Sequence, residues 1–118
     1  MTKKQSEAEI TCCAPEEPGV EPDLRPVEGP AADEELAALA KALGHPARVR
    51  ILRLLSSKEA RVCSQIVGEL PLAQSTVSEH LRILKEVGLV RSREVGPGAR
   101  YCINYPVLKR LKALVSSI

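Results

Sequence analysis

The sequence predicts a mainly helical domain with one small β-hairpin, in the order α-α-α-α-β-β-α, and three observations support this. The chain has 118 residues, 44% of them hydrophobic and 27% charged, which suits one small domain. It contains no Phe and no Trp, so its core must be built from Leu, Ile, Val and Ala, a composition that favours helices. Apolar residues recur at helical spacing from residue 31 onward, and the period changes to that of strands after Gly88.

Two helices are expected first. Apolar residues at 36, 39, 40 and 43 share one face of the first helix, the acidic run 33–35 suits its positive end, and Gly44 can stop it. The second helix runs from Pro46, a favoured first helical residue, to Leu55, with its arginines facing outward. His45 lies in the turn before Pro46, where capping of the helix accounts for it.

The next two helices form a helix-turn-helix over residues 65–87. A short third helix is expected after Ser64, its candidate N-cap, with its end at Leu70. The fourth is expected over 74–87 and is ended by Gly88. Its apolar residues at 77, 81 and 84 share one face, and His80 is expected to be structural on that side. The opposite face is polar and holds Gln74, Ser75, Ser78, Glu79, Arg82 and Lys85.

A hairpin and a last helix complete the domain. Residues 89–95 and 100–105 are typical of strands, and they flank Gly96-Pro97-Gly98, a turn sequence. Apolar residues at 107, 108, 111, 114 and 115 predict the final helix. A helix-turn-helix followed at once by a hairpin is the winged helix-turn-helix plan, in which the second helix of the motif enters the major groove of DNA.

Two stretches carry a family resemblance. Residues 41–52, KALGHPARVRIL, and residues 74–90, QSTVSEHLRILKEVGLV, resemble the ArsR/SmtB family of metal- and metalloid-responsive bacterial repressors, of the arsenical-resistance operon type. The likeness covers about residues 33–116. It implies a homodimer, usually formed by the first and last helices, that binds an operator with dyad symmetry and is released when an inducer binds.

The polar face of the fourth helix supports DNA binding independently. Four side chains at its start suit hydrogen bonds to base edges and phosphates: Gln74, Ser75, Thr76 and Ser78. Five basic side chains can neutralise phosphates around the groove: Arg82, Lys85, Arg91, Arg93 and Arg100. Glu79 departs from this pattern, and it either accepts a hydrogen bond from a cytosine amino group or points away. A face that is merely solvated is the alternative, which the helix-turn-helix context disfavours.

The first 32 residues differ from the rest of the chain. Residues 1–30 hold three basic and seven acidic side chains, whereas residues 31–118 hold fourteen basic and eight acidic ones. Residues 1–30 also contain five of the nine prolines. We expect residues 1–32 to form a flexible or extended acidic arm ahead of a DNA-binding and dimerisation domain over 33–118. No apolar run approaches about 20 residues and no signal peptide is recognisable, so we expect an intracellular protein. The family resemblance implies that it is bacterial and cytoplasmic, and associated with the nucleoid.

Four cysteines suggest what the protein senses. Cys12 and Cys13 are adjacent and therefore poor disulfide partners, so they should persist as a dithiol. Arsenite or antimonite takes three sulfurs, and Cys63 is the preferred third because the start of the third helix favours a thiolate. About nineteen residues separate Cys13 from Asp33, so an extended arm can reach the site in either subunit. Cys102, on the second strand, is a less favoured ligand.

The resemblance bears on this site as well. Some members of the family carry a Cys-x-Cys pair at the third helix, where this sequence has Val62-Cys63-Ser64, with one cysteine in the middle position. An N-terminal arm that supplies cysteines to that region, often of the other subunit, also has parallels in the family. The last helix has no His, Asp or Glu, so the zinc site that some relatives build between their C-terminal helices is not expected.

Other interpretations remain open. Cadmium or lead could use the same sulfurs, and a tail cysteine could instead form a redox or persulfide switch with Cys63. A winged helix that serves only as a protein-interaction module would show no salt-dependent operator binding. An enzyme is not expected, because the sequence has no phosphate-binding glycine loop, no nucleophile elbow and no histidines at metal-ligand spacing.

Overall fold

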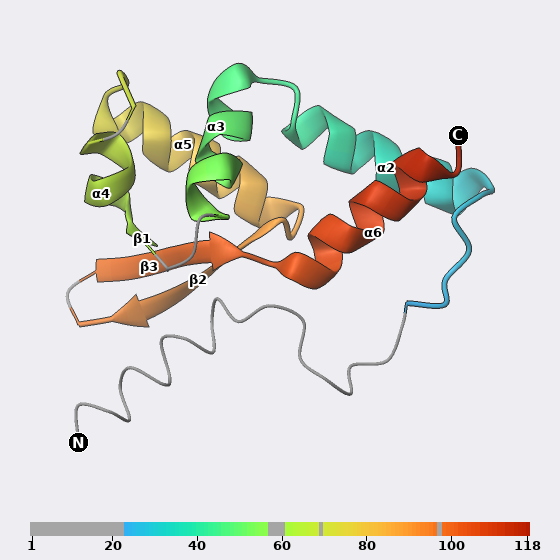
Figure 1. The fold of residues 1–118 in the computed structure, drawn as a ribbon. Helices are drawn as coiled ribbons and strands as arrows, with labels where there is room; N and C mark the ends of the chain where they lie inside the picture. Colours follow the sequence, from blue (N-terminus) through green and yellow to red (C-terminus); the bar gives the residue numbers. More distant parts are fainter. Residues whose placement is uncertain (1–22, 57–60, 69, 97) are drawn as a thin grey trace.

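A computed structural model describes residues 23–56, 61–68, 70–96 and 98–118 of the chain, and it confirms a winged helix-turn-helix. Figure 1 shows helices packed around a small sheet, with the helix-turn-helix and the sheet on one side and α2 (Pro30–Ala42) and α6 (Tyr105–Ser116) crossing on the other. Among the described residues, none of the helices combines the length and the apolar character that crossing a bilayer requires.

The helices follow the apolar periods of the sequence. They are α2 (Pro30–Ala42), α3 (Pro46–Leu55), α4 (Cys63–Gly68), α5 (Gln74–Glu86) and α6 (Tyr105–Ser116). Proline in the first turn starts α2, α3 and α6, as expected for a residue whose missing N–H costs nothing there. His45 caps α3 by accepting a hydrogen bond from the Ala47 N–H at 3.0 Å, which confirms the capping role.

The sheet has one strand more than expected. Strands β2 (Val90–Val95) and β3 (Gly98–Ile103) form the expected antiparallel hairpin, and β1 (Arg61–Val62) pairs with the other edge of β3, giving the order β1-β3-β2. The sequence does not reveal β1, because two residues are too few to show an alternating pattern. This strand ties the start of α4 to the hairpin, since Cys63 follows Val62 directly.

Several boundaries differ from the expectation, among them the end of the third helix, which is Gly68 and not Leu70. Ser64 is not the N-cap of the third helix, because α4 already begins at Cys63, directly after β1. The second strand of the hairpin begins at Gly98 and ends at Ile103, because Val95 pairs with Gly98 across a tight turn that contains Gly96 at φ +65°. Tyr105 therefore belongs to α6 and not to the strand.

The core lies between the helices and one face of the sheet. Val77, Leu81 and Leu84 of α5 are almost completely buried, as expected, together with Ile51 of α3 and Leu114 of α6. Cross-strand partners Val90 and Ile103 close this core from the sheet side. Burial of these residues orients α5 so that its opposite face is left to solvent.

Candidate DNA-binding surface and thiol site

The exposed face of α5 carries the polar residues singled out in the sequence. Gln74, Ser75, Thr76 and Ser78 lie in the first turns of α5 and are all exposed. Ala73, the residue before the helix, is extended and makes no side-chain cap, so the N-terminal turn of α5 is not covered by a capping side chain. The structure thus brings four short hydrogen-bonding side chains to one exposed helix end.

Glu79 and Arg82 are engaged with each other on this face. The guanidinium of Arg82 donates to both carboxylate oxygens of Glu79, at 3.0 and 2.7 Å, and also lies 3.6 Å from the Glu86 carboxylate. The hydrogen bonds to Arg82 hold the pKa of Glu79 below its usual value. Glu79 therefore stays charged at neutral pH and orients Arg82, a role that the i, i+3 spacing could have suggested.

On the inner side, His80 fixes how α5 packs against α3. His80 is 7% exposed, and its Nδ1 lies 3.1 Å from Nη1 of Arg48 on α3. A guanidinium only donates, so His80 Nδ1 accepts this hydrogen bond and its proton is on Nε2. Burial, the neighbouring His45 ring and Arg48 all lower the pKa of His80, so its ring is neutral at pH 7. The structural role expected for His80 is confirmed.

The hairpin adds basic side chains beside the helix-turn-helix. Arg91 and Arg93 of β2 are exposed and Arg100 of β3 is half-buried. Arg93 and Arg100 are direct cross-strand partners, so two guanidinium groups extend from the same face of the hairpin. Lys85 is exposed in the last turn of α5.

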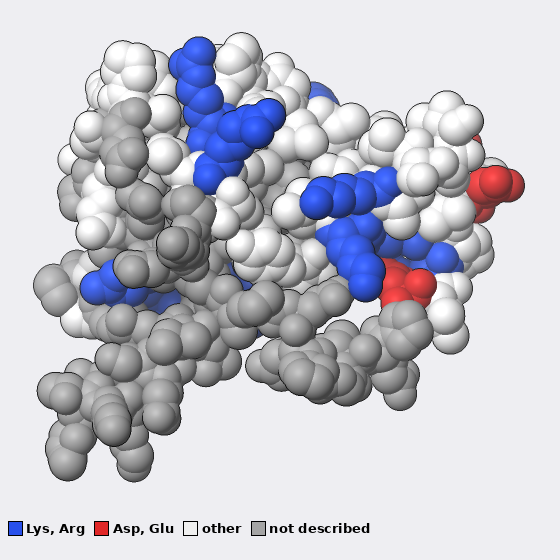
Figure 2. All heavy atoms as spheres, in the orientation of Figure 1, with Lys and Arg blue, Asp and Glu red and all other residues white. Residues whose placement is uncertain are grey.

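Basic residues are not confined to α5 and the hairpin. Figure 2 shows the face of the molecule that carries α3 and α6, where blue side chains gather over both helices and red ones are few. Each of these helices holds three basic residues and no acidic one. Basic side chains thus lie on this face as well as around α5 and the hairpin, which favours attraction to a polyanion without specifying its orientation.

The structure places the cysteines unequally. Cys12 and Cys13 lie outside the described residues, and of Cys63 the structure describes the backbone, as the first residue of α4 rather than the residue before it. Cys102 is 1% exposed and pairs in register with Arg91. Because β1 pairs Val62 with Arg100, Cys102 is offset from Cys63 by three positions along the ladder, roughly 10 Å.

Within the described ranges, no group of three or more His, Cys, Asp or Glu residues is arranged to hold a metal ion. A site with Cys63 therefore needs sulfurs from elsewhere in the chain or from a second copy. The chemistry of the remaining donors, two adjacent thiols in residues 1–22, fits a soft ion better than a hard one.

Comparisons with known proteins agree with this geometry. Residues 45–92 match the sequence profile of the family described as "Bacterial regulatory protein, arsR family". The chain is 36% identical over 85 residues to an uncharacterised HTH-type transcriptional regulator of Methanocaldococcus jannaschii, covering 72% of this chain and 96% of that protein. It is 33% identical over 75 residues to the arsenical resistance operon repressor of Staphylococcus xylosus, covering 64% and 71% respectively.

Solved structures show the same architecture. The homodimeric winged helix-turn-helix DNA-binding domain of a possible family regulator from Mycobacterium bovis superposes with a TM-score of 0.62 at 33% identity, covering 74% of this chain and 80% of that one. The similarity therefore covers a larger share of the chain than residues 45–92 do.

Proposed function

The chain belongs to the arsR family of bacterial regulatory proteins, and we propose on this basis that it is a transcriptional repressor that binds operator DNA as a homodimer and releases it when As(III) or Sb(III) binds cysteine thiolates. The observation that carries the DNA-binding part is the orientation of α5. Its apolar residues are buried, and the same packing leaves Gln74, Ser75, Thr76 and Ser78 exposed at one end.

We assign different roles to the two kinds of side chain around α5. Gln74, Ser75, Thr76 and Ser78 would contact base edges and phosphates in the major groove, because their groups both donate and accept. The basic residues would contact phosphates on either side: Arg82, Lys85, Arg91, Arg93 and Arg100. Glu79 would act through Arg82, by holding its guanidinium 2.7 Å from its own carboxylate until a phosphate competes for it.

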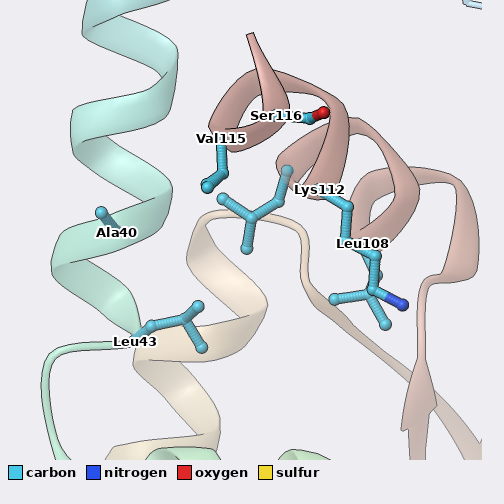
Figure 3. Close-up of a pocket in the computed structure, with 7 residues that line it drawn as sticks. Ala40, Leu43, Leu108, Lys112, Val115 and Ser116 are labelled. Atoms are coloured by element: carbon cyan, nitrogen blue, oxygen red, sulfur yellow. The ribbon is translucent and has the colours of Figure 1, made fainter. Parts of the chain in front are cut away.

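An apolar groove between α2 and α6 supports the homodimer. Figure 3 shows Ala40 of α2, and Leu43 directly after that helix, facing Leu108, Lys112 and Val115 of α6 across it. The groove has a volume of about 520 Å³ and a largely apolar lining, and Val115 is 53% exposed. A second copy of the same surface would cover it, and a two-fold interface of this kind matches an operator with dyad symmetry.

The inducer is assigned from the thiols. Cys12, Cys13 and Cys63 offer three sulfurs, the number that As(III) and Sb(III) take, and a relative from Staphylococcus xylosus carries the name of an arsenical resistance operon repressor. Binding would tie the N-terminal arm to the start of α4, at the base of the helix-turn-helix. A coupling free energy of about 1–3 kcal/mol would weaken operator binding about 5–150-fold, sufficient to start transcription of resistance genes.

Substitution of Cys63 tests the inducer assignment. Cys63→Ser is expected to bind a labelled operator duplex as tightly as the wild type but to lose the response to arsenite, because only two sulfurs remain. The measurement is fluorescence anisotropy of the duplex during titration with arsenite under strong reductant. Cys102→Ala serves as the matched control and keeps the response, since Cys102 is buried in β3 and offset from Cys63. An unchanged arsenite response in Cys63→Ser rejects the site.

The same titration separates the alternative inducers. Release by cadmium or lead but not by arsenite would assign the sulfurs to those ions. Release by peroxide, with a shifted mobility that reductant reverses, would assign Cys63 and a tail cysteine to a redox switch. A protein-interaction module would show no duplex binding that weakens steeply with salt, whereas a repressor would.

A further inference from the structure

Arg110 is a buried arginine on α6 that joins three segments of the chain. It is 5% exposed, and its guanidinium donates to both carboxylate oxygens of Glu35 on α2, at 3.1 and 3.0 Å. The same guanidinium donates to two backbone carbonyls of the segment before α2, Arg25 O at 3.0 Å and Pro26 O at 2.7 Å. Every contact lies on one side of α6, and none of them involves α5 or the hairpin.

Burial of an arginine is costly unless its N–H groups are hydrogen-bonded, so these contacts are what allows Arg110 to be buried. A planar guanidinium with a fixed set of donors can serve a carboxylate and two carbonyls together, whereas a lysine ammonium could not match that geometry. With a side chain only 4% exposed, Arg110 cannot contact DNA phosphates. Its function must therefore be sought in what it holds.

What Arg110 holds is the segment 23–29, directly ahead of α2. Nearer to α2, the Ser117 Oγ lies 3.2 Å from Val27 O, and its single proton is shared between this carbonyl and Leu114 O at 2.7 Å. The carboxylates of the cluster are charged: Arg110 lowers the pKa of Glu35, and Arg25 lowers the pKa of Asp23. The chain is thus fastened to α6 from about Asp23 onward, ten residues earlier than Asp33.

This attachment changes how far the cysteine pair can reach. Ten residues beyond Cys13 bring the chain to Asp23, and an extended chain of that length spans at most about 33 Å. If the chain were free up to Asp33, the maximum distance that Cys13 could reach from its point of attachment would be twice as long. Figure 1 shows that segment 23–29 lies beside α2 and α6, at the opposite side of the molecule from β1 and α4, where Cys63 lies.

We propose that Arg110 is a positioning residue that anchors the N-terminal arm on the α2–α6 pair, so that ion capture between the arm and Cys63 acts on the helices of the dimer interface. The identity of the inducer in this inference rests on the proposed function, whereas the attachment of the arm rests on the contacts of Arg110. When the segment between the cysteine pair and the attachment point is short, ion binding at the cysteines pulls on α2 and α6. When that segment is longer, the ion binds without shifting these helices.

Two variants of the full chain test this: one removes the hydrogen bonds of Arg110, and the other lengthens the segment between the cysteine pair and segment 23–29. Arg110→Met removes every hydrogen bond that Arg110 makes to Glu35 and to segment 23–29, while keeping an unbranched side chain. A ten-residue Gly-Ser insertion between Gly19 and Val20 leaves Arg110 and its partners intact and lengthens the tether. Arg50→Met is the matched control, because Arg50 is an exposed arginine on α3.

Three measurements are made on each protein: cleavage after Glu28 by a glutamate-specific protease, followed by mass spectrometry; the stoichiometry of arsenite binding; and the affinity for a fluorescein-labelled duplex selected by the protein from a random library. We expect cleavage after Glu28 to be at least tenfold faster in Arg110→Met than in the wild type, and unchanged in the other variants. The stoichiometry of arsenite binding should be the same in all four proteins. Arsenite weakens duplex binding about 5–150-fold in the wild type and Arg50→Met, and less than threefold in the other two variants.

The outcomes separate the anchor from the inducer. Unchanged cleavage in Arg110→Met overturns the anchor, and a wild-type arsenite effect in the insertion variant, which does not touch the fold, overturns the tether. A wild type that binds the duplex but ignores arsenite overturns the proposed inducer and the coupling with it. In that case the cleavage comparison alone still decides whether Arg110 holds segment 23–29.

Discussion

The residues of α5 divide two tasks between them, since those on one face form the core and those on the other face are exposed to a binding partner. Glu79 is the residue that least suits an approach to phosphate, and its bidentate hydrogen bonds to Arg82 give it a role within the protein. A carboxylate that pairs with an exposed guanidinium restrains it at little energetic cost, because both groups remain solvated. Glu79 is therefore expected to moderate the phosphate contact of Arg82 rather than to read a base.

Glu79→Gln tests this role. We expect operator affinity at low salt to rise by about threefold to tenfold, because a negative charge is removed and Arg82 is released. The slope of log K against log salt should become steeper by about 0.9, as for one further phosphate contact. Glu86→Gln, which removes the carboxylate 3.6 Å from Arg82, is the control and should have a smaller effect. A fall in affinity that is confined to operators with one particular C·G pair would show that Glu79 reads a base.

His80 gives the domain a pH dependence of defined sign. Its pKa is lowered from 6.5 in the folded chain, mainly by burial and then by His45 and Arg48, while Glu79 opposes the shift. The unfolded chain therefore binds more protons than the folded one as pH falls below 6.5. Stability is full above that pH and decreases as pH falls toward the lowered value.

The expected slope from His80 is at most about 1.4 kcal/mol per pH unit below pH 6.5. Urea denaturation at pH 7.5, 6.5 and 5.5 measures it, and His80→Gln should flatten the profile in this range. Glu35 and Glu79 have pKa values lowered from the ordinary 4.5, so their protonation affects stability only at more acidic pH and does not obscure this window. An equal slope in the wild type and in His80→Gln would contradict the assignment.

At the scale of elements, the junction between α5 and β2 sets where the wing begins. Gly88 has φ +86°, and the chain around it closes α5 with hydrogen bonds from Gly88 N to Lys85 O and from Leu89 N to Leu84 O, both 3.0 Å. A positive φ at the end of a helix is the conformation in which a glycine is favoured. Leu89, completely buried, then leads directly into β2.

Gly88→Ala is expected to lower the free energy of unfolding by about 1 kcal/mol, because an alanine at positive φ is strained. The added Cβ would meet only the two methyl groups of Val107, at 3.7 and 4.0 Å, which are ordinary contacts, so the cost arises from the backbone. Gly98→Ala, which meets nothing within 4 Å and has no positive φ, should change stability by less than about 0.5 kcal/mol. Urea denaturation distinguishes the two, and equal losses would refute the backbone explanation.

At the scale of the whole molecule, we expect the apolar groove between α2 and α6 to form the homodimer interface. Val115→Glu places a charge on its rim, and we expect a monomer in analytical ultracentrifugation and a loss of operator affinity of more than about tenfold, since two linked half-sites no longer act together. Ile118→Glu is the control, because Ile118 is 94% exposed and lies outside the groove lining. A dimeric Val115→Glu chain with wild-type affinity would place the interface elsewhere.

The sequence alone determined the helices, the hairpin and the polar face of α5. These features depend on local rules: a 3.6-residue period places Val77, Leu81 and Leu84 on one side, proline starts helices, and glycines allow the turn between β2 and β3. The family resemblance also rests on contiguous stretches, and residues 45–92 confirm it. The assignments of operator contacts and of Cys12, Cys13 and Cys63 stay predictions.

Only the tertiary structure decided which residues from distant parts of the chain meet. β1 exists because β3 offers it an open edge, Cys102 is buried because of its place in the sheet, and Arg110 is buried because Glu35 and the carbonyls of Arg25 and Pro26 converge on it. In the sequence, Arg110 looks like any exposed arginine on an amphipathic helix. The physical reason is that a charge can be buried only where its partners are, and 75 residues separate Arg110 from Glu35.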